Sequence, residues 1–236
     1  LWVNTTMQRN LLDSLILTRQ NPCVVIAGSG DVYGNAAPEL NPIHELVELR
    51  PANPYALSKA IQDLMGYQYW ASHQLRIIRV RPFLQLGPRR DDRFVAGHFA
   101  RQIAEIEADL REPIIRVGSI DLRRDFTDVR DVASAYIHAA DHGVPGEAYN
   151  IASGVAHSLR DMLLIMLEHT RKPAEICTDP ELVRPGEPAL LIGDASKLRH
   201  LAGWAPTISF EQSVLDTVTY WENQVARDPV PSKGQS

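Results

Sequence analysis

The sequence has little of what marks several common classes of protein. Its two cysteines are too few for a disulfide framework, and its eight histidines do not stand with Cys, Asp or Glu at metal-site spacing, so we expect no bound metal. No stretch is long and apolar enough to cross a membrane, which favours a cytoplasmic location. A formal net charge of -5 argues against a general nucleic-acid-binding protein.

The turn that usually begins a dinucleotide-binding domain is also missing. No Gly-x-Gly-x-x-Gly or Gly-x-x-Gly-x-x-Gly turn follows an early strand, and the first residues, "LWVNTTMQRN", are typical of the inside of a helix. We therefore expect a fragment that lacks an N-terminal part, whose doubly wound sheet is incomplete. One functional hypothesis is accordingly a truncated, non-catalytic chain.

What is present is a regular alternation of short apolar runs and amphipathic segments. The apolar runs predict strands within 23–28, 75–83, 113–118, 147–152 and 174–179. The helical spacing predicts helices within 4–17, 53–73, 94–110, 128–141, 158–170, 194–202 and 209–225. The alternation predicts an α/β fold, a partial Rossmann-type doubly wound parallel sheet with a smaller C-terminal α/β lobe. We place the first domain at 1–112, the lobe mainly at 113–226 with some elements returning to the first domain, and a disordered tail at 227–236.

Lysine is scarce, with four among the 24 basic residues, so the position of Lys59 is informative. In "NPYALSKA" it stands four residues after Tyr55, which places both side chains on one face of a helix. Ser29, in "AGSGDVYG", comes just after an expected strand, at the edge of the sheet where ligands bind in open α/β folds. Together the three residues form a candidate catalytic constellation.

These residue types suit the reduction of a carbonyl group. A tyrosine hydroxyl titrates near ~10 in water, and a shift of about three units, or ~4 kcal/mol, would bring its proton exchange to neutral pH. A nearby ammonium favours the phenolate and supplies such a shift. The serine hydroxyl can hold the carbonyl oxygen, which then receives a proton from Tyr55 while a hydride reaches the carbon. The alternative is a packed tyrosine and a solvent-exposed lysine.

Three motifs carry a family resemblance: "GSGDVYG", "NPYALSKA" and "RVRPFLQLGP". The chain resembles the extended short-chain dehydrogenase/reductases, the NAD-dependent epimerase/dehydratase family. Downstream segments such as "RPGEPALLIGDASKLRHLAGWAP" resemble its GDP-mannose subgroup. Within that subgroup it is most similar to reductases that convert GDP-4-keto-6-deoxy-D-mannose to GDP-D-rhamnose. The resemblance implies NADP or NAD as cofactor and a GDP-sugar as substrate.

The resemblance also assigns roles to single residues. It implies that Ser29, Tyr55 and Lys59 are catalytic, with Tyr55 and Lys59 also contacting the cofactor. Arg90, in "GPRRDD", matches a cofactor-contacting arginine. The remaining matches are to substrate-contacting positions, which here are Ser29, Ser119, Arg124, Arg184 and Glu187. Two alternatives stay open, a surface-loop role for Arg184 and a structural ion pair between Arg124 and Asp125.

Two departures from the family pattern bear on the substrate. Leu84 and Gln85 stand where the family usually has Asn-His, and Leu84 cannot form a hydrogen bond. The related 4,6-dehydratases usually carry a glutamate base two residues after the catalytic Ser or Thr, and this chain has Asp31 there. The shorter side chain favours a reductase, with a GDP-mannose 4,6-dehydratase as the alternative.

The helices expected at 4–17 and 53–72 carry apolar residues on more than one face, which is typical of an interface. Examples are Leu64, Met65, Tyr67 and Trp70. The family resemblance implies that these helices pair across a two-fold axis as a four-helix bundle, so we expect a homodimer.

Overall fold

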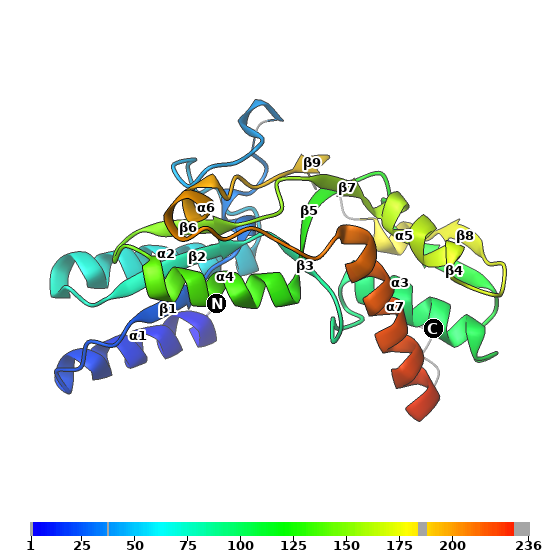
Figure 1. Ribbon diagram of the computed structural model, residues 1–236, viewed down its shortest axis with the longest axis horizontal. Coiled ribbons are helices and arrows are strands. Elements are labelled where there is room, and N and C mark those ends of the chain that lie inside the picture. Colours follow the sequence, from blue (N-terminus) through cyan, green and yellow to red (C-terminus); the bar gives the residue numbers. More distant parts are fainter. Residues whose placement is uncertain (1, 37, 184–187, 229–236) are drawn as a thin grey trace. The chain divides into compact units, whose positions relative to one another are not determined.

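The computed structural model describes residues 2–36, 38–183 and 188–228 (Figure 1). The helices are α1 (Trp2–Leu17), α2 (Pro54–His73), α3 (Val95–Glu107), α4 (Val129–His142), α5 (Leu159–Glu168), α6 (Ser196–Ala202) and α7 (Phe210–Arg227). The strands are β1 (Val24–Ala27), β2 (Ile77–Pro82), β3 (Leu84–Leu86), β4 (Ile114–Val117), β5 (Arg123–Asp128), β6 (Ala148–Ile151), β7 (Ala156–Ser158), β8 (Glu175–Thr178) and β9 (Leu190–Leu191). Three short 3-10 helices are η1 (Gly30–Tyr33), η2 (Pro38–Leu40) and η3 (Pro180–Leu182). The predicted α/β class with parallel strands is confirmed.

The chain forms two compact units. Unit 1 contains residues 1–85, 125–156 and 190–207, and unit 2 contains 86–124, 157–189 and 208–236. A further sheet has the strand order β3-β5-β7, with β9 paired to β5. The domain division predicted at residue 112 stays a prediction, and most of the predicted tail lies outside the described residues.

Unit 1 is built on a parallel sheet in the order β1-β2-β6. Val24 of β1 is in register with Ile77, and Arg79 of β2 with Ala148. Because the strands are parallel, their carboxyl ends meet at one edge. That edge is continued by the loop that holds Ser29.

Apolar side chains pack on both faces of this sheet, which explains the continuous apolar run of β1. On one face Ile77 packs with Leu12 of α1 and Tyr69 of α2. On the other, Ile78 and its neighbours pack with α4 and α6 in a larger cluster that contains Val132, Ala135 and Leu198. Helices therefore bury the strands of this sheet from both faces.

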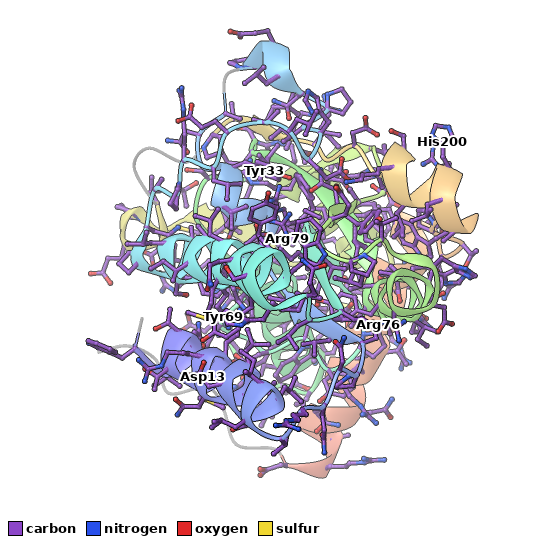
Figure 2. The ribbon with its side chains drawn as sticks, turned by 90° about the vertical axis from the view of Figure 1, so that its left-hand side faces the viewer. Asp13, Tyr33, Tyr69, Arg76, Arg79 and His200 are labelled. Carbon is purple, nitrogen blue, oxygen red and sulfur yellow. The ribbon has the colours of Figure 1, made fainter. Side chains whose placement is uncertain are left out.

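Helices α1 and α2 lie side by side in unit 1. The Tyr69 hydroxyl donates a hydrogen bond of 2.5 Å to Asp13 Oδ1, and the two side chains meet between the helices (Figure 2). Gln8 Nε2 donates to the Gln62 carbonyl at 2.8 Å. Gly66 allows α2 to approach the sheet closely, because a Cβ there would lie 2.4 Å from Ile26 Cδ1.

Unit 2 packs α3 against α5 and α7, beside a two-stranded parallel sheet of β4 and β8. The Glu105 side chain, 1% exposed, binds Arg101 at 2.9 Å and Arg111 at 3.2 Å. The Trp221 indole donates to the Arg90 carbonyl at 3.2 Å and so ties α7 to the segment before α3. No helix within the described ranges is long and apolar enough to cross a membrane.

Candidate functional site

The helix that carries Tyr55 begins where the sequence predicts. Asn53 caps α2, its side chain accepting a hydrogen bond of 2.8 Å from the Ala56 amide, and Pro54 takes the first helical position. Tyr55 therefore stands in the first turn, where its side chain is 51% exposed. The cap and the proline therefore fix the start of the helical turn that carries Tyr55.

Lys59 connects this helix to the end of strand β1. Its Nζ donates a hydrogen bond of 2.8 Å to the Ala27 carbonyl, two residues before Ser29. The side chain is half-buried, and this burial lowers the pKa of Lys59 below its ordinary value. The contact brings Lys59, and with it the Tyr55 turn, to the carboxyl edge of the sheet.

Ser29 occupies a tightly packed turn at the same edge. It is 9% exposed and caps η1, with its Oγ accepting from the Asp31 amide at 3.2 Å. Glycine is needed on both sides. A Cβ on Gly28 would lie 2.7 Å from the Val80 carbonyl oxygen, and one on Gly30 would lie 3.0 Å from the Phe83 ring. The two glycines of "AGSG" therefore allow the turn that holds Ser29 to pack closely against β2 and Phe83.

Tyr136 on α4 is a neighbour that the sequence analysis missed. Burial, and to a smaller extent the charge of a Tyr55 phenolate, raises the pKa of Tyr136 to about 12. Tyr136 therefore keeps its proton through the neutral range. The sequence analysis predicted a helix within 128–141, and no local pattern in it marked Tyr136.

The donor set at this edge fits a nicotinamide cofactor. The Lys59 ammonium and the Ser29 hydroxyl lie at the carboxyl ends of parallel strands, where dinucleotides bind in such sheets, and the Tyr55 phenol is carried one turn before Lys59 on α2. Lys59 and Tyr55 are the residues of unit 1 that would contact it. No group of three or more His, Cys, Asp or Glu side chains among residues 2–36, 38–183 and 188–228 could hold a metal ion.

The other predicted residues lie in unit 2 or outside the described residues. The Arg90 guanidinium stacks on the Phe94 ring, 3.6 Å from its centroid. Ser119 is half-buried just after β4, and Arg124 is buried at 7% exposure and donates to the Arg123 carbonyl. Arg184 and Glu187 lie outside the described residues. Ligand contacts for all five stay predictions.

Asp125, the proposed ion-pair partner of Arg124, is held by other groups. Its carboxylate accepts from the Ser153 amide at 2.8 Å and hydroxyl at 2.6 Å, and from the amides of Gly154 and Gly193. These bonds are enough to explain a buried carboxylate at this position.

Comparisons with known proteins show the family of the chain. The sequence pattern of the GDP-mannose 4,6 dehydratase family matches residues 3–217. A GDP-6-deoxy-D-mannose reductase from Pseudomonas aeruginosa is 35% identical over 94% of the chain, which spans 75% of that protein. GDP-mannose 4,6 dehydratase 1 from Arabidopsis thaliana is 28% identical over 80% of the chain, which spans 51% of that enzyme. The solved structure of RMD from Pseudomonas aeruginosa complexed with NADPH aligns with a TM-score of 0.89 at 35% identity, covering 94% of this chain and 74% of that one.

Proposed function

Because the chain belongs to the GDP-mannose 4,6 dehydratase family of nucleotide-sugar oxidoreductases, we propose that it reduces the 4-keto group of a GDP-4-keto-6-deoxy-hexose. The product would be GDP-D-rhamnose. The observation that carries the proposal is the contact of Lys59 Nζ with the Ala27 carbonyl, which brings the Tyr55 turn to the Ser29 edge. Its similarity to a GDP-6-deoxy-D-mannose reductase favours reduction over dehydration.

The residues divide the reaction between them. A bound nicotinamide cofactor supplies the hydride. The Ser29 hydroxyl donates to the keto oxygen, and the Tyr55 hydroxyl gives that oxygen its proton. Lys59 stabilises the phenolate that is left and holds a ribose hydroxyl of the cofactor. Arg90 for the cofactor, and Ser119, Arg124, Arg184 and Glu187 for the nucleotide-sugar, complete the proposal.

A direct assay tests the proposal. The purified protein is mixed with GDP-4-keto-6-deoxy-D-mannose and NADPH or NADH, and the product is identified by NMR. We expect cofactor oxidation matched by GDP-D-rhamnose. A product with the opposite configuration at C4 would disprove the assigned stereochemistry, and no turnover with either cofactor would disprove the reductase.

A GDP-mannose 4,6-dehydratase is the second candidate, because the matching family pattern is named for that activity. Asp31 would have to act as its base. Its amide is held by the Ser29 side chain at 3.2 Å, and the residue is half-buried. Incubation with GDP-mannose and the oxidised cofactor would yield a 4-keto product only if this candidate is right.

We further propose that a second copy of the chain covers the outer surface of α1 and α2. Exposed apolar side chains gather on these two adjacent helices, and each of them is more than 40% exposed: Trp2, Val3, Met7, Leu11, Leu57, Leu64 and Tyr67. Four helices from two copies would then form one bundle. Separately, we propose that the protein is located in the cytoplasm.

Sedimentation velocity tests the dimer. The double variant Met7→Glu/Leu64→Glu should sediment as a monomer at micromolar concentration, where the parent is a dimer. Ile137→Glu is the matched control, because Ile137 is 63% exposed on α4 and should leave the dimer intact. A parent that is monomeric under these conditions would exclude the pairing.

A further inference from the structure

The two segments that carry the catalytic residues are connected beneath the surface by buried polar groups. Ser29 begins η1 and Tyr33 ends it, so one short helix holds both residues. Tyr33 is completely buried, at 0% exposure. The position of the Tyr33 side chain therefore constrains the turn that holds Ser29.

The Tyr33 hydroxyl has a partner on each side. It donates to Asn150 Oδ1 at 2.7 Å and accepts from Arg81 Nη1 at 2.9 Å. Burial raises the pKa of Tyr33 to about 12, although the charge of Arg81 opposes this effect. The hydroxyl consequently keeps its proton and its donor role throughout the neutral range.

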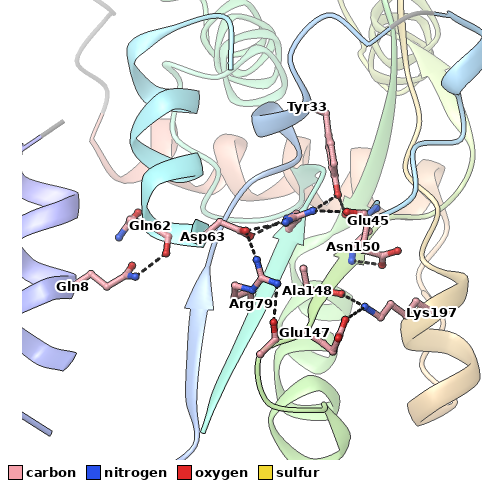
Figure 3. A network of polar contacts seen from close by, with 12 residues as sticks. Gln8, Tyr33, Glu45, Gln62, Asp63, Arg79, Glu147, Ala148, Asn150 and Lys197 are labelled. Carbon is pink, nitrogen blue, oxygen red and sulfur yellow. Dashed lines mark hydrogen bonds and ion pairs between the residues drawn. The ribbon is translucent and has the colours of Figure 1, made fainter. Parts of the chain in front are cut away.

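Arg81 extends this chain to α2, where Asp63 lies; Figure 3 shows Asp63 beside Arg79 and Tyr33 in this network. Arg81 Nε and Nη2 each bind the Asp63 carboxylate at 2.8 Å, in the two-point geometry that best fixes a guanidinium. Asp63 lies on α2, four residues after Lys59 and eight after Tyr55. The same carboxylate also binds Arg79 Nη1 at 2.6 Å, so its position is set from two strand residues.

We infer that Asp63, Arg81 and Tyr33 form a positioning relay that sets the Ser29 hydroxyl against the Tyr55 and Lys59 turn. All three side chains are buried and their bonds are directional, so one segment cannot shift without breaking a bond to the other. None of the three touches the reacting atoms. The effect on the reaction rests on the function proposed above, whereas the effect on the η1 turn does not.

Tyr33→Phe tests the relay with little disturbance. The ring keeps its packing on Phe83, 6.2 Å between centroids, and Arg81 Nη1 keeps its bond of 3.0 Å to the Glu45 carbonyl. Only the hydroxyl is lost. Tyr149→Phe is the matched control. Tyr149 is 1% exposed in the same unit, and its hydroxyl accepts from the Val144 amide at 2.9 Å, away from both catalytic segments.

The first measurement needs no activity. Hydrogen exchange of the peptide containing residues 29–35 reports the η1 amides, with a peptide from β2 as the internal reference. Tyr33→Phe should speed exchange in the η1 peptide by about tenfold relative to the reference, as expected for a lost buried hydrogen bond. Tyr149→Phe should leave that ratio unchanged. An unchanged ratio in Tyr33→Phe would overturn the relay, whatever reaction the protein catalyses.

The second measurement separates positioning from general damage. Tyr33→Phe should lower the single-turnover rate about tenfold with KM for the cofactor unchanged, but by less than about twofold when Ser29 is already alanine. Equal losses in both backgrounds would show a general structural effect and refute the role of Tyr33 in placing Ser29. If the parent reduces no keto-sugar, the proposed function fails while hydrogen exchange still decides the relay.

Discussion

Helix α2 carries two polar regions along one stripe, and they behave differently. Its first turns present Tyr55, half-exposed, and Lys59, which reaches a main-chain oxygen at the edge of the sheet. One turn further, Asp63 has no exposed surface and is bound by two arginines. Over about two turns of α2, residues spaced by four therefore change from half-exposed, at Tyr55, to fully buried, at Asp63.

The difference shows how one helix can be both open and fixed. Tyr55 itself is half-exposed, as a phenol that meets a ligand must be, so its own side chain contributes little burial. The anchoring is supplied instead by the Asp63 cluster, where a carboxylate in the low-dielectric interior is fully satisfied by guanidinium groups. On the proposed function, the reactive side chain and the anchoring side chain are therefore separate residues of the same helix.

Distance alone would not reveal this division. Arg160 and Asp121 of unit 2 also lie 2.8 Å apart, yet their side chains are 49% and 80% exposed. Water screens such a pair and competes for its hydrogen bonds. The four predictions below test whether the buried Asp63 cluster stabilises the fold while the exposed residues do not.

The largest effect is expected at the exposed end. Tyr55→Phe removes the proton donor and should lower kcat by about a thousandfold, or ~4 kcal/mol in the barrier. Cofactor binding and the urea midpoint should stay the same, because the ring and the helix cap are retained. Activity within a few-fold of the parent would exclude Tyr55 as the acid.

The buried end should show the opposite pattern. Asp63→Ala leaves two buried guanidiniums without their carboxylate and should reduce the free energy of unfolding by about 3–5 kcal/mol. Urea denaturation followed by circular dichroism measures this loss. A loss no larger than that of a surface variant would show that water relieves the arginines and that Asp63 is no anchor.

Lys59 lies between the two regions and should show an intermediate effect. Burial lowers its pKa below 10.5, so the ammonium is present at low pH and is lost as pH rises through this lowered value. Activity should therefore fall on the alkaline side. Lys59→Arg keeps its charge past pH ~12 and should move this alkaline limb to higher pH, at a reduced kcat. An alkaline limb that stays in place would assign it to another group.

The smallest effect is expected at the exposed pair of unit 2. Asp121→Asn should leave the urea midpoint unchanged within error, and added salt should make no further difference. A clear decrease would mean that exposed ion pairs also anchor this protein, and the contrast with Asp63 would lose its basis.

Much of the supporting framework could be predicted because its signals are local. The cap at Asn53 and the first-turn Pro54 predicted the start of α2, and the apolar run at 23–28 predicted β1. A helix buried on one face, such as α4, shows this in the spacing of the buried residues along its sequence. The strands missed were β3, β5, β7 and β9, most of which have only two or three residues and are paired with partners distant in sequence.

The candidate site divides in the same way. The spacing of Tyr55 and Lys59 is a helical property and could be predicted. The alternation of Arg79 and Arg81 in β2 was visible, but abundant arginine made each one uninformative. Their shared partner Asp63 emerges only when α2 packs on the strand. The role of Tyr33 could not be predicted either. Its partners Arg81 and Asn150 are distant in sequence, and η1 is too short to show a periodic pattern.

The acceptor chosen by Lys59 has a consequence for which positions can vary. A main-chain oxygen is carried by every amino acid, and the Ala27 side chain itself is exposed. Substitutions at residue 27 should therefore leave the bond to Lys59 unchanged, provided that the larger side chain points outward as that of Ala27 does. Position 59 has no such latitude, since its partner is reached only by a long, flexible donor. In a scan of all substitutions at both positions, tolerance should be broad at 27 and confined to long basic side chains at 59, although the two residues share one hydrogen bond.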